Sequence, residues 1–220
     1  MEATLGGTTM NWAKTLLLGC AVVAFAGPAA AEPAASPYAT MVAAIEPGKT
    51  DADYGALRRA YVESESYDPY GTKILDLVSA MRDAFSAGDC KTAAKDAETI
   101  ATLQFTDIEA HMVAALCLER TGDHAKADFQ HAIFLGLVHS ILDSGDGLAP
   151  ATAYRVVSLD EEYAVLNLLD LKVGQQALVQ DSGHSYDRFT VSMADAKGEI
   201  EVFFEIDPIL KALDREFQTP

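Results

Sequence analysis

The sequence predicts an α+β fold in which antiparallel helix hairpins are followed by a small α+β unit with an antiparallel β-meander. Three observations predict it. Apolar residues recur at helical spacing from about residue 73 to 142. Two glycine–aspartate pairs, 34 residues apart, interrupt that segment. Beyond residue 170 the apolar spacing changes to that of short strands joined by polar, glycine-containing turns.

The composition is that of a globular protein, because half of the 220 residues are apolar and 22% are charged. The 33 acidic residues outnumber the 16 basic ones, so the formal net charge is -17. Nucleic-acid binding without sequence preference depends on neutralising phosphates with Lys and Arg. Docking on anionic lipid needs the same charge. We therefore expect no nucleic-acid partner and no stable membrane insertion after leader removal.

The N-terminus has the pattern of a cleavable signal peptide over residues 1–31. Lys14 precedes an apolar run, residues 15–26, that is too short for a bilayer span of about 20 residues. Ala29–Ala31 supplies the small residues that signal peptidase needs. We therefore expect export to the periplasm or the exterior. Lipid attachment at Cys20 is the less favoured alternative, because it would shorten the apolar region to about five residues.

Three regions are expected beyond the leader. Residues 32–52 begin with a Pro/Ala-rich stretch and are expected to form a flexible tether. Residues 53–147 carry the helical pattern. Residues 148–220 form the small α+β region, with strands expected near 153–157, 171–180, 184–193 and 198–206, and helices expected to begin at Ser158 and Asp207.

The helical region resembles tetratricopeptide repeats. Gly88-Asp89 and Gly122-Asp123 are separated by the length of one such repeat, and residues 109–123 look like its first helix and turn. Small Ala115 falls where two helices would approach closely. The resemblance implies stacked hairpins with a concave surface that docks a protein segment. The Trp, Tyr and terminal Pro of the repeat consensus are absent, so an ordinary four-helix arrangement remains the alternative.

Two cysteines remain after the leader, Cys90 and Cys117. If residues 90–120 fold as a hairpin about residues 104–105, the two lie nearly level across it. We expect a disulfide between them in an oxidising compartment, with a pair of buried thiols as the alternative.

The mature chain as a whole resembles an uncharacterised bacterial family of exported or cell-envelope proteins, defined by a domain of unknown function. Four motifs carry the resemblance: Tyr67-Asp-Pro-Tyr-Gly71, the Ser144-Gly-Asp-Gly147 to Ala153-Tyr154 turn, Asp160-Glu-Glu-Tyr163 and Gly183-His-Ser-Tyr-Asp187. The resemblance implies a fold and a compartment. It implies no activity.

The sequence supports no catalytic residue, no cofactor and no metal site. No phosphate loop, G-x-S-x-G or H-E-x-x-H motif occurs, and the histidines form no i, i+4 pair. The acids at 160–162 suit the first turn of a capped helix. In an extended segment, His184 and Tyr186 point to one face and Asp187 to the other.

Two classes of function remain open. The first is an exported, non-enzymatic protein-interaction module (a scaffold or adaptor) of the cell envelope, whose acidic charge favours a basic or peptide-like partner. The second is a small-ligand binder or enzyme with a pocket between the helical hairpins and the C-terminal sheet. The candidate binding residues are Asp146, Tyr154, His184, Tyr186 and Asp187.

Overall fold

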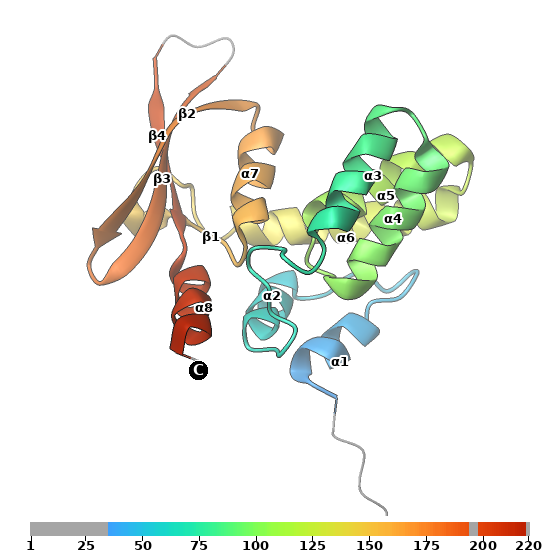
Figure 1. Ribbon diagram of the computed structural model, residues 1–220, viewed down its shortest axis with the longest axis horizontal. Coiled ribbons are helices and arrows are strands. Elements are labelled where there is room, and N and C mark those ends of the chain that lie inside the picture. Colours follow the sequence, from blue (N-terminus) through green and yellow to red (C-terminus); the bar gives the residue numbers. More distant parts are fainter. Residues whose placement is uncertain (1–34, 194–197, 219–220) are drawn as a thin grey trace, which may run out of the picture. The chain divides into compact units, whose positions relative to one another are not determined.

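A computed structural model describes residues 35–193 and 198–218 of the chain. The expected signal peptide, residues 1–31, lies outside the described residues. The α+β fold class is confirmed (Figure 1). The elements are α1 (Pro37–Ala43), α2 (Tyr54–Val62), α3 (Leu75–Ser86), α4 (Cys90–Leu103), α5 (Ile108–Thr121), α6 (His124–Leu142), the short 3-10 helix η1 (Pro150–Thr152), β1 (Tyr154–Arg155), α7 (Leu159–Leu168), β2 (Leu171–Asp181), β3 (His184–Met193), β4 (Ile200–Glu205) and α8 (Asp207–Gln218).

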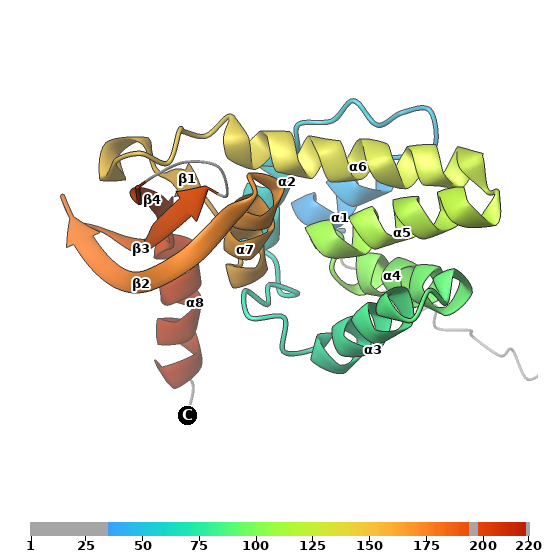
Figure 2. The ribbon, with the colours of Figure 1, turned by 90° about the horizontal axis from the view of Figure 1, so that it is seen from above.

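Helices α3 to α6 pack consecutively, each against the next, as both ribbon views show (Figures 1 and 2). Gly88 and Gly122 end α3 and α5 with φ angles of 78° and 89°, a left-handed conformation that glycine adopts without steric cost. Asp89 and Asp123 then cap the next helices through side-chain bonds to backbone N–H groups. None of the described helices has the length and hydropathy that a membrane crossing requires.

The start of α5 differs in one detail from a Thr-x-x-Glu capping pattern. The cap is Asp107, whose Oδ1 accepts a 2.7 Å hydrogen bond from the N–H of Ala110. Thr106 lies one residue before this cap. Aspartate also satisfies a free N–H at a helix start, and its charge favours the positive end of the helix dipole.

The described part of the expected tether is ordered structure. Ser36 caps α1 by accepting a hydrogen bond from the N–H of Ala39, and Tyr38 and Ile45 are buried in the main core. The Pro/Ala composition around residue 35 predicts a tether, but the apolar side chains that follow provide enough burial to hold this segment against α2.

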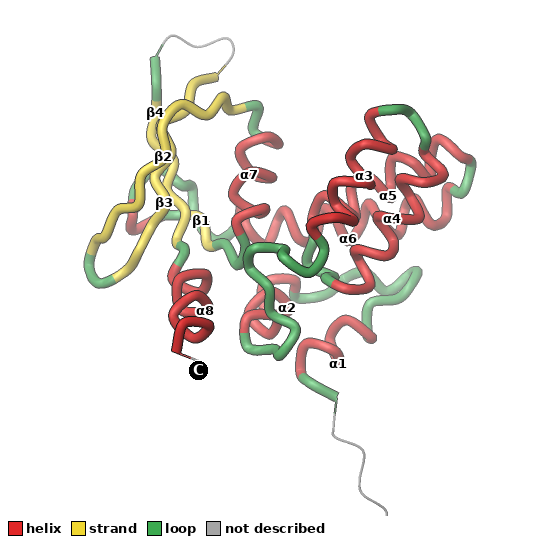
Figure 3. Tube along the Cα trace, viewed as in Figure 1, coloured by secondary structure: helices red, strands yellow, loops and turns green. Residues whose placement is uncertain are grey.

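The strands form one four-stranded sheet in the order β1-β4-β3-β2 (Figure 3). β2, β3 and β4 are the expected antiparallel meander, with Tyr186 paired to Glu205 across β3 and β4. The sheet is nevertheless mixed, because β1 pairs with β4 in parallel, Tyr154 opposite Phe204. A two-residue strand carries too little alternation to predict its partner or its direction.

The main core is shared between the helical region and the sheet. It contains Leu57 of α2 and Ile133 of α6 together with Phe189 of β3 and Ile209 of α8. A second core of mostly small side chains lies within α3 to α6. The two regions therefore bury apolar surface against each other.

Glu162 is an unusual residue of this core. It lies on α7 with no exposed surface, and neither carboxylate oxygen has a hydrogen-bond partner among the described residues. The pKa of Glu162 is raised to about 9, chiefly by burial and also by the nearby carboxylates of Asp187 and Glu161. Glu162 is therefore protonated at neutral pH in the folded protein.

Replacing Glu162 by glutamine should stabilise the protein at alkaline pH and leave it unchanged at acid pH. Because the pKa is raised on folding, the wild type loses stability as the pH rises from the unfolded value of about 4.5 towards 9, at about 1.4 kcal/mol per pH unit. E162Q should thus be more stable than the wild type by roughly 5 kcal/mol at about pH 8. Urea denaturation at about pH 8 and at acid pH measures this difference in stability, with exposed Glu65→Gln as the control. Equal stability of E162Q and wild type at pH 8 would contradict it.

Candidate functional site

A buried ion pair joins the helical region to the C-terminal region. The guanidinium of Arg58 on α2 donates to both carboxylate oxygens of Glu161 on α7, at 2.8 and 2.6 Å. Both side chains are at most 5% exposed. Arg58 also donates to the carbonyl oxygens of Ser140 and Arg155, and Glu161 accepts a bond from the N–H of Val157. Each charge therefore has several partners, which offsets the cost of removing both from water.

Two cavities lie on either side of this ion pair. Arg58 lines a groove of about 730 Å³, and Glu161 lines a smaller cavity of about 380 Å³. The Arg58–Glu161 ion pair therefore separates the groove from the smaller cavity. The chemistry of the two sides differs: two further arginines line the groove, whereas the smaller cavity, which we call the acidic cavity, has Arg82 as its one base.

The groove lies between α2 and one end of the sheet. Arg59 comes from α2, Arg155 from β1, and His184 and Tyr186 from the start of β3. The rings of His184 and Tyr186 are 6.5 Å apart. The groove is therefore lined by three arginines together with the acidic side chains of Glu63, Asp181 and Glu205.

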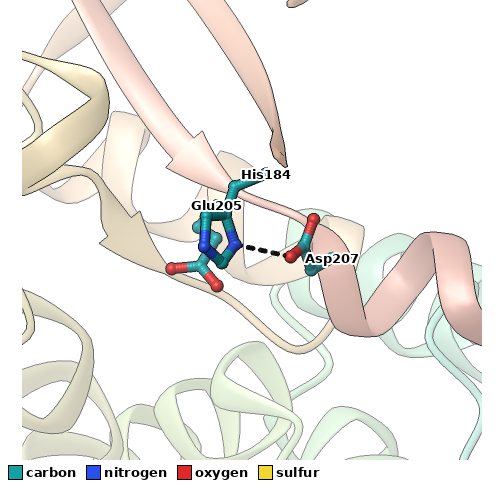
Figure 4. A group of neighbouring side chains, drawn as sticks. All are labelled: His184, Glu205 and Asp207. Atoms are coloured by element: carbon teal, nitrogen blue, oxygen red, sulfur yellow. Dashed lines mark hydrogen bonds and ion pairs between the residues drawn. The ribbon is translucent and has the colours of Figure 1, made fainter. Parts of the chain in front are cut away.

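Three side chains that can each bind a metal ion lie close together at the groove: His184 and Glu205 line it, and Asp207 is their neighbour (Figure 4). The Nδ1 atom of His184 lies 2.8 Å from Oδ2 of Asp207, the first residue of α8. Glu205, at the end of β4, lies beside them and forms a 3.5 Å ion pair with Arg155. Partial burial acts to raise the pKa of Asp207, but hydrogen bonds from the N–H of Ser185 and from His184 lower it overall.

The acidic cavity lies where α3, α5 and α6 meet α7. Its apolar wall is formed by Ile108, Met112, Phe134, Ala164 and Leu168. Its polar wall contains the carboxyl groups of Asp107, Glu109 and Asp160. Arg82 of α3 also lines it, and its Nε donates to both carboxylate oxygens of Glu109, at 2.8 and 2.9 Å.

Asp107 is the most unusual group in this cavity. Its side chain is almost fully buried, and Oδ1 is occupied by the capping bond to Ala110. The pKa of Asp107 is raised to about 7, chiefly by burial and also by the carboxyl groups of Asp160 and Glu109, while the bond from Ala110 and the charge of Arg82 act in the opposite direction. The pKa of Asp160 is also raised, chiefly by desolvation of its carboxyl group.

The structure brings together two of the five candidate binding residues. His184 and Tyr186 both line the groove, whereas Asp187 lies on the opposite face of β3, buried, where it accepts a 2.8 Å bond from Gln176. Asp146 is occupied with its own loop, since its Oδ1 accepts bonds from Thr152 and from the N–H of Leu148. Tyr154 is buried against Phe204 in the main core.

Several residues of both cavities carried no signal in the sequence. Arg58, Arg82 and Asp107 each sit within or beside an ordinary helical pattern, where a charge is usually solvated or a cap. Their partners are distant in sequence: Arg58 and Glu161 are 103 residues apart. Asp160 was visible only as a helix-start acid. The one available signal was the pair of helix-capping residues before α5 and α7, Asp107 and Ser158, which both line the acidic cavity.

The two cysteines lie where the hairpin argument places them. Both are buried, and their sulfur atoms are 2.6 Å apart, between α4 and α5. The structure contains them as free thiols, not as a disulfide. The pKa of the Cys117 thiol is raised to about 12, chiefly by burial and also by the neighbouring Cys90 sulfur.

Fold and site together define an α+β protein whose helical region and mixed sheet meet at two charged cavities. The chain belongs to the family DUF4919, a domain of unknown function, whose family model matches residues 46–215, more than half of the chain. The resemblance to an uncharacterised family is thereby confirmed. No curated protein matches the chain, and no solved structure matches it.

Breaking the Arg58–Glu161 ion pair should destabilise the whole protein. Arg58→Met leaves Glu161 as a buried charge without its main partner, which typically costs about 3–5 kcal/mol. Arg59→Met is the matched control, because Arg59 is the next residue on the same helix and is exposed. Chemical denaturation should show the large loss for R58M and a change near zero for R59M. A loss in R58M no larger than that in R59M would disprove the structural role of the ion pair.

Proposed function

We propose that this protein is an exported, non-enzymatic interaction module of the cell envelope that binds a basic side chain of a protein partner in the acidic cavity. The observation that carries the proposal is Asp107: a nearly buried carboxyl group that lines the cavity and whose Oδ1 accepts the capping bond from Ala110. A guanidinium or ammonium group would donate hydrogen bonds to this carboxyl group and supply a compensating charge.

The cavity suits one long basic side chain. Its volume of about 380 Å³ is at the small end of ligand sites, which span about 300–1,000 Å³. The apolar wall of Met112, Phe134 and Leu168 can pack against the methylene groups of Arg or Lys, while Asp107 and Asp160 meet the charged head. The net charge of -17 favours encounter with a basic partner.

We infer further that α3–α4 and α5–α6 are tetratricopeptide-like hairpins. In support, the turn glycines Gly88 and Gly122 are 34 residues apart, each is followed by a capping Asp, and the second core consists largely of alanines and other small side chains. Export is supported by the leader pattern of residues 1–31, which lies outside the described residues.

A second candidate function is the binding of a small ligand in the groove. The specific observation is that the groove lies between the helical region and the sheet, where it places His184 and Tyr186 beside Arg59 and Arg155. Arginines suit anionic groups, and the tyrosine ring suits an aromatic or apolar part. A ligand of this kind would be anionic, in contrast to the basic partner of the acidic cavity.

The acidic cavity should bind an arginine side chain, and more tightly at higher pH. The probe is an acetylated and amidated pentapeptide with one central arginine between leucines, measured by calorimetry. In the free protein Asp107 ionises near pH 7, facing Asp160, Glu109 and Arg82, and a cation binds its ionised form. The affinity should therefore be on the order of tenfold higher at about pH 8 than at about pH 5.5.

Asp107→Asn separates charge from fold in this measurement. Asparagine caps a helix as well as aspartate does, so D107N keeps the bond to Ala110 and should fold normally. It should lose both the affinity and its pH dependence, whereas exposed Asp128→Asn on α6 should bind like the wild type. The proposal fails if D107N binds as tightly as the wild type, or if a peptide with citrulline in place of arginine binds equally well.

Under oxidising conditions Cys90 and Cys117 should form a disulfide. Their sulfur atoms are already in contact, and on the chain-entropy model closing this 28-residue loop stabilises the protein by about 3.5 kcal/mol. Peptide mapping without reductant after oxidative refolding should recover the linked pair. Unfolding should occur at lower urea concentration when dithiothreitol is added, and C90S/C117S should show no such effect. Recovery of two alkylated thiols after oxidation would contradict the bridge.

A further inference from the structure

We propose that His184, Glu205 and Asp207 form a binding site for a divalent transition-metal cation, foremost Zn²⁺, on the wall of the groove. One ligand atom from each residue lies within 4.8 Å of the other two (Figure 4). An imidazole nitrogen with two carboxylate oxygens is a donor set that Zn²⁺ accepts. Ca²⁺ and Mg²⁺ prefer oxygen ligands alone. The inference concerns the groove and does not depend on the acidic cavity.

The backbone holds the three residues in fixed positions, although each comes from a different element. The N–H of Ser185 donates to Oδ1 of Asp207 at 2.9 Å, and the carbonyl oxygen of Ser185 accepts from the N–H of Ile206 at 3.0 Å. Glu205 is held by its register opposite Tyr186. A cation would therefore find a site that is largely preorganised, so that little ordering remains to oppose binding.

The spacing of the ligand atoms suits a tetrahedral ion. Zinc–ligand bonds of about 2.0–2.1 Å place neighbouring ligand atoms about 3.3 Å apart. Nδ1 of His184 and Oδ2 of Asp207 are 2.8 Å apart, and no pair in the set exceeds 4.8 Å. Side-chain movements of about an ångström would bring all three to bonding distance. The imidazole would then bind the cation through Nδ1 and keep its proton on Nε2.

The site has an open side. His184 is 53% exposed, whereas Glu205 and Asp207 are 26% and 16% exposed, so the imidazole is the ligand most open to solvent. Three protein ligands with one position facing a cavity is the pattern of zinc sites that bind a further molecule, rather than of closed structural sites. An anionic ligand of the groove could therefore complete the coordination.

Arg155 is the group that a cation would displace. Its guanidinium Nε lies 3.5 Å from Glu205, and its side chain is 73% exposed. An ion pair as exposed as this contributes little free energy, so Arg155 can turn away to solvent. Because it competes for Glu205 and repels a cation, Arg155→Gln should increase the affinity for Zn²⁺.

The test is calorimetric titration of the full chain with Zn²⁺, with Mg²⁺ and Ca²⁺ as comparison ions. One Zn²⁺ should bind, and H184A and E205Q should each lower the affinity at least about tenfold. Arg155→Gln should raise it. Exposed His131→Ala on α6 is the matched control and should leave it unchanged. Circular dichroism of each variant confirms that it is folded.

A second measurement distinguishes metal binding at this site from metal binding by the thiols of Cys90 and Cys117. With Co²⁺ in place of Zn²⁺, the bound ion should show ligand-field absorption without a thiolate charge-transfer band. The proposal is overturned by wild-type Zn²⁺ affinity in H184A, by a thiolate band that disappears in C90S/C117S, or by Mg²⁺ binding as tightly as Zn²⁺.

Discussion

The architecture depends on one buried ion pair, Arg58–Glu161. Removing a guanidinium and a carboxylate from water costs several kcal/mol for each ion, and only a complete set of partners offsets that cost. Here the partners are the carbonyl oxygens of Ser140 and Arg155 and the N–H of Val157. The pair can therefore exist only when α2, the end of α6, β1 and α7 are all in place. Its formation fixes the junction at which both cavities lie.

Two buried carboxyl groups near this junction differ in whether a ligand can reach them, and this difference decides whether their raised pKa affects stability alone or also binding. Glu162 and Asp107 both have a raised pKa, chiefly because of burial. Glu162 has no exposed surface, so its proton affects the free energy of unfolding and is not open to a ligand. Asp107 lines a cavity, so a cation can reach it and replace the proton. Desolvation of the carboxyl group thus affects protein stability at Glu162 and cation binding at Asp107.

The sequence predicts what is local. Strand boundaries at β2 and β3, the turns at Gly88 and Gly122 and the cap at Ser158 follow from spacing and turn chemistry over a few residues. The sites do not follow, because each is assembled from residues far apart. A lone arginine on α2 gives no sign that its partner comes 103 residues later. His184 is a candidate binding residue because it shares a strand face with Tyr186. Glu205 and Asp207, in contrast, look like the end of a strand and the start of a helix.

The junction is also the reason to regard residues 35–218 as one folding unit rather than as a repeat with an appended sheet. The main core combines Leu57 and Ile133 of the helical region with Phe189 and Ile209 of the C-terminal region. Separating the regions would expose that surface and leave Arg58 and Glu161 as unpaired charges. Neither region is therefore expected to be stable alone. The groove and the acidic cavity follow from how the two regions pack, and their walls are fixed by the same contacts that stabilise the fold.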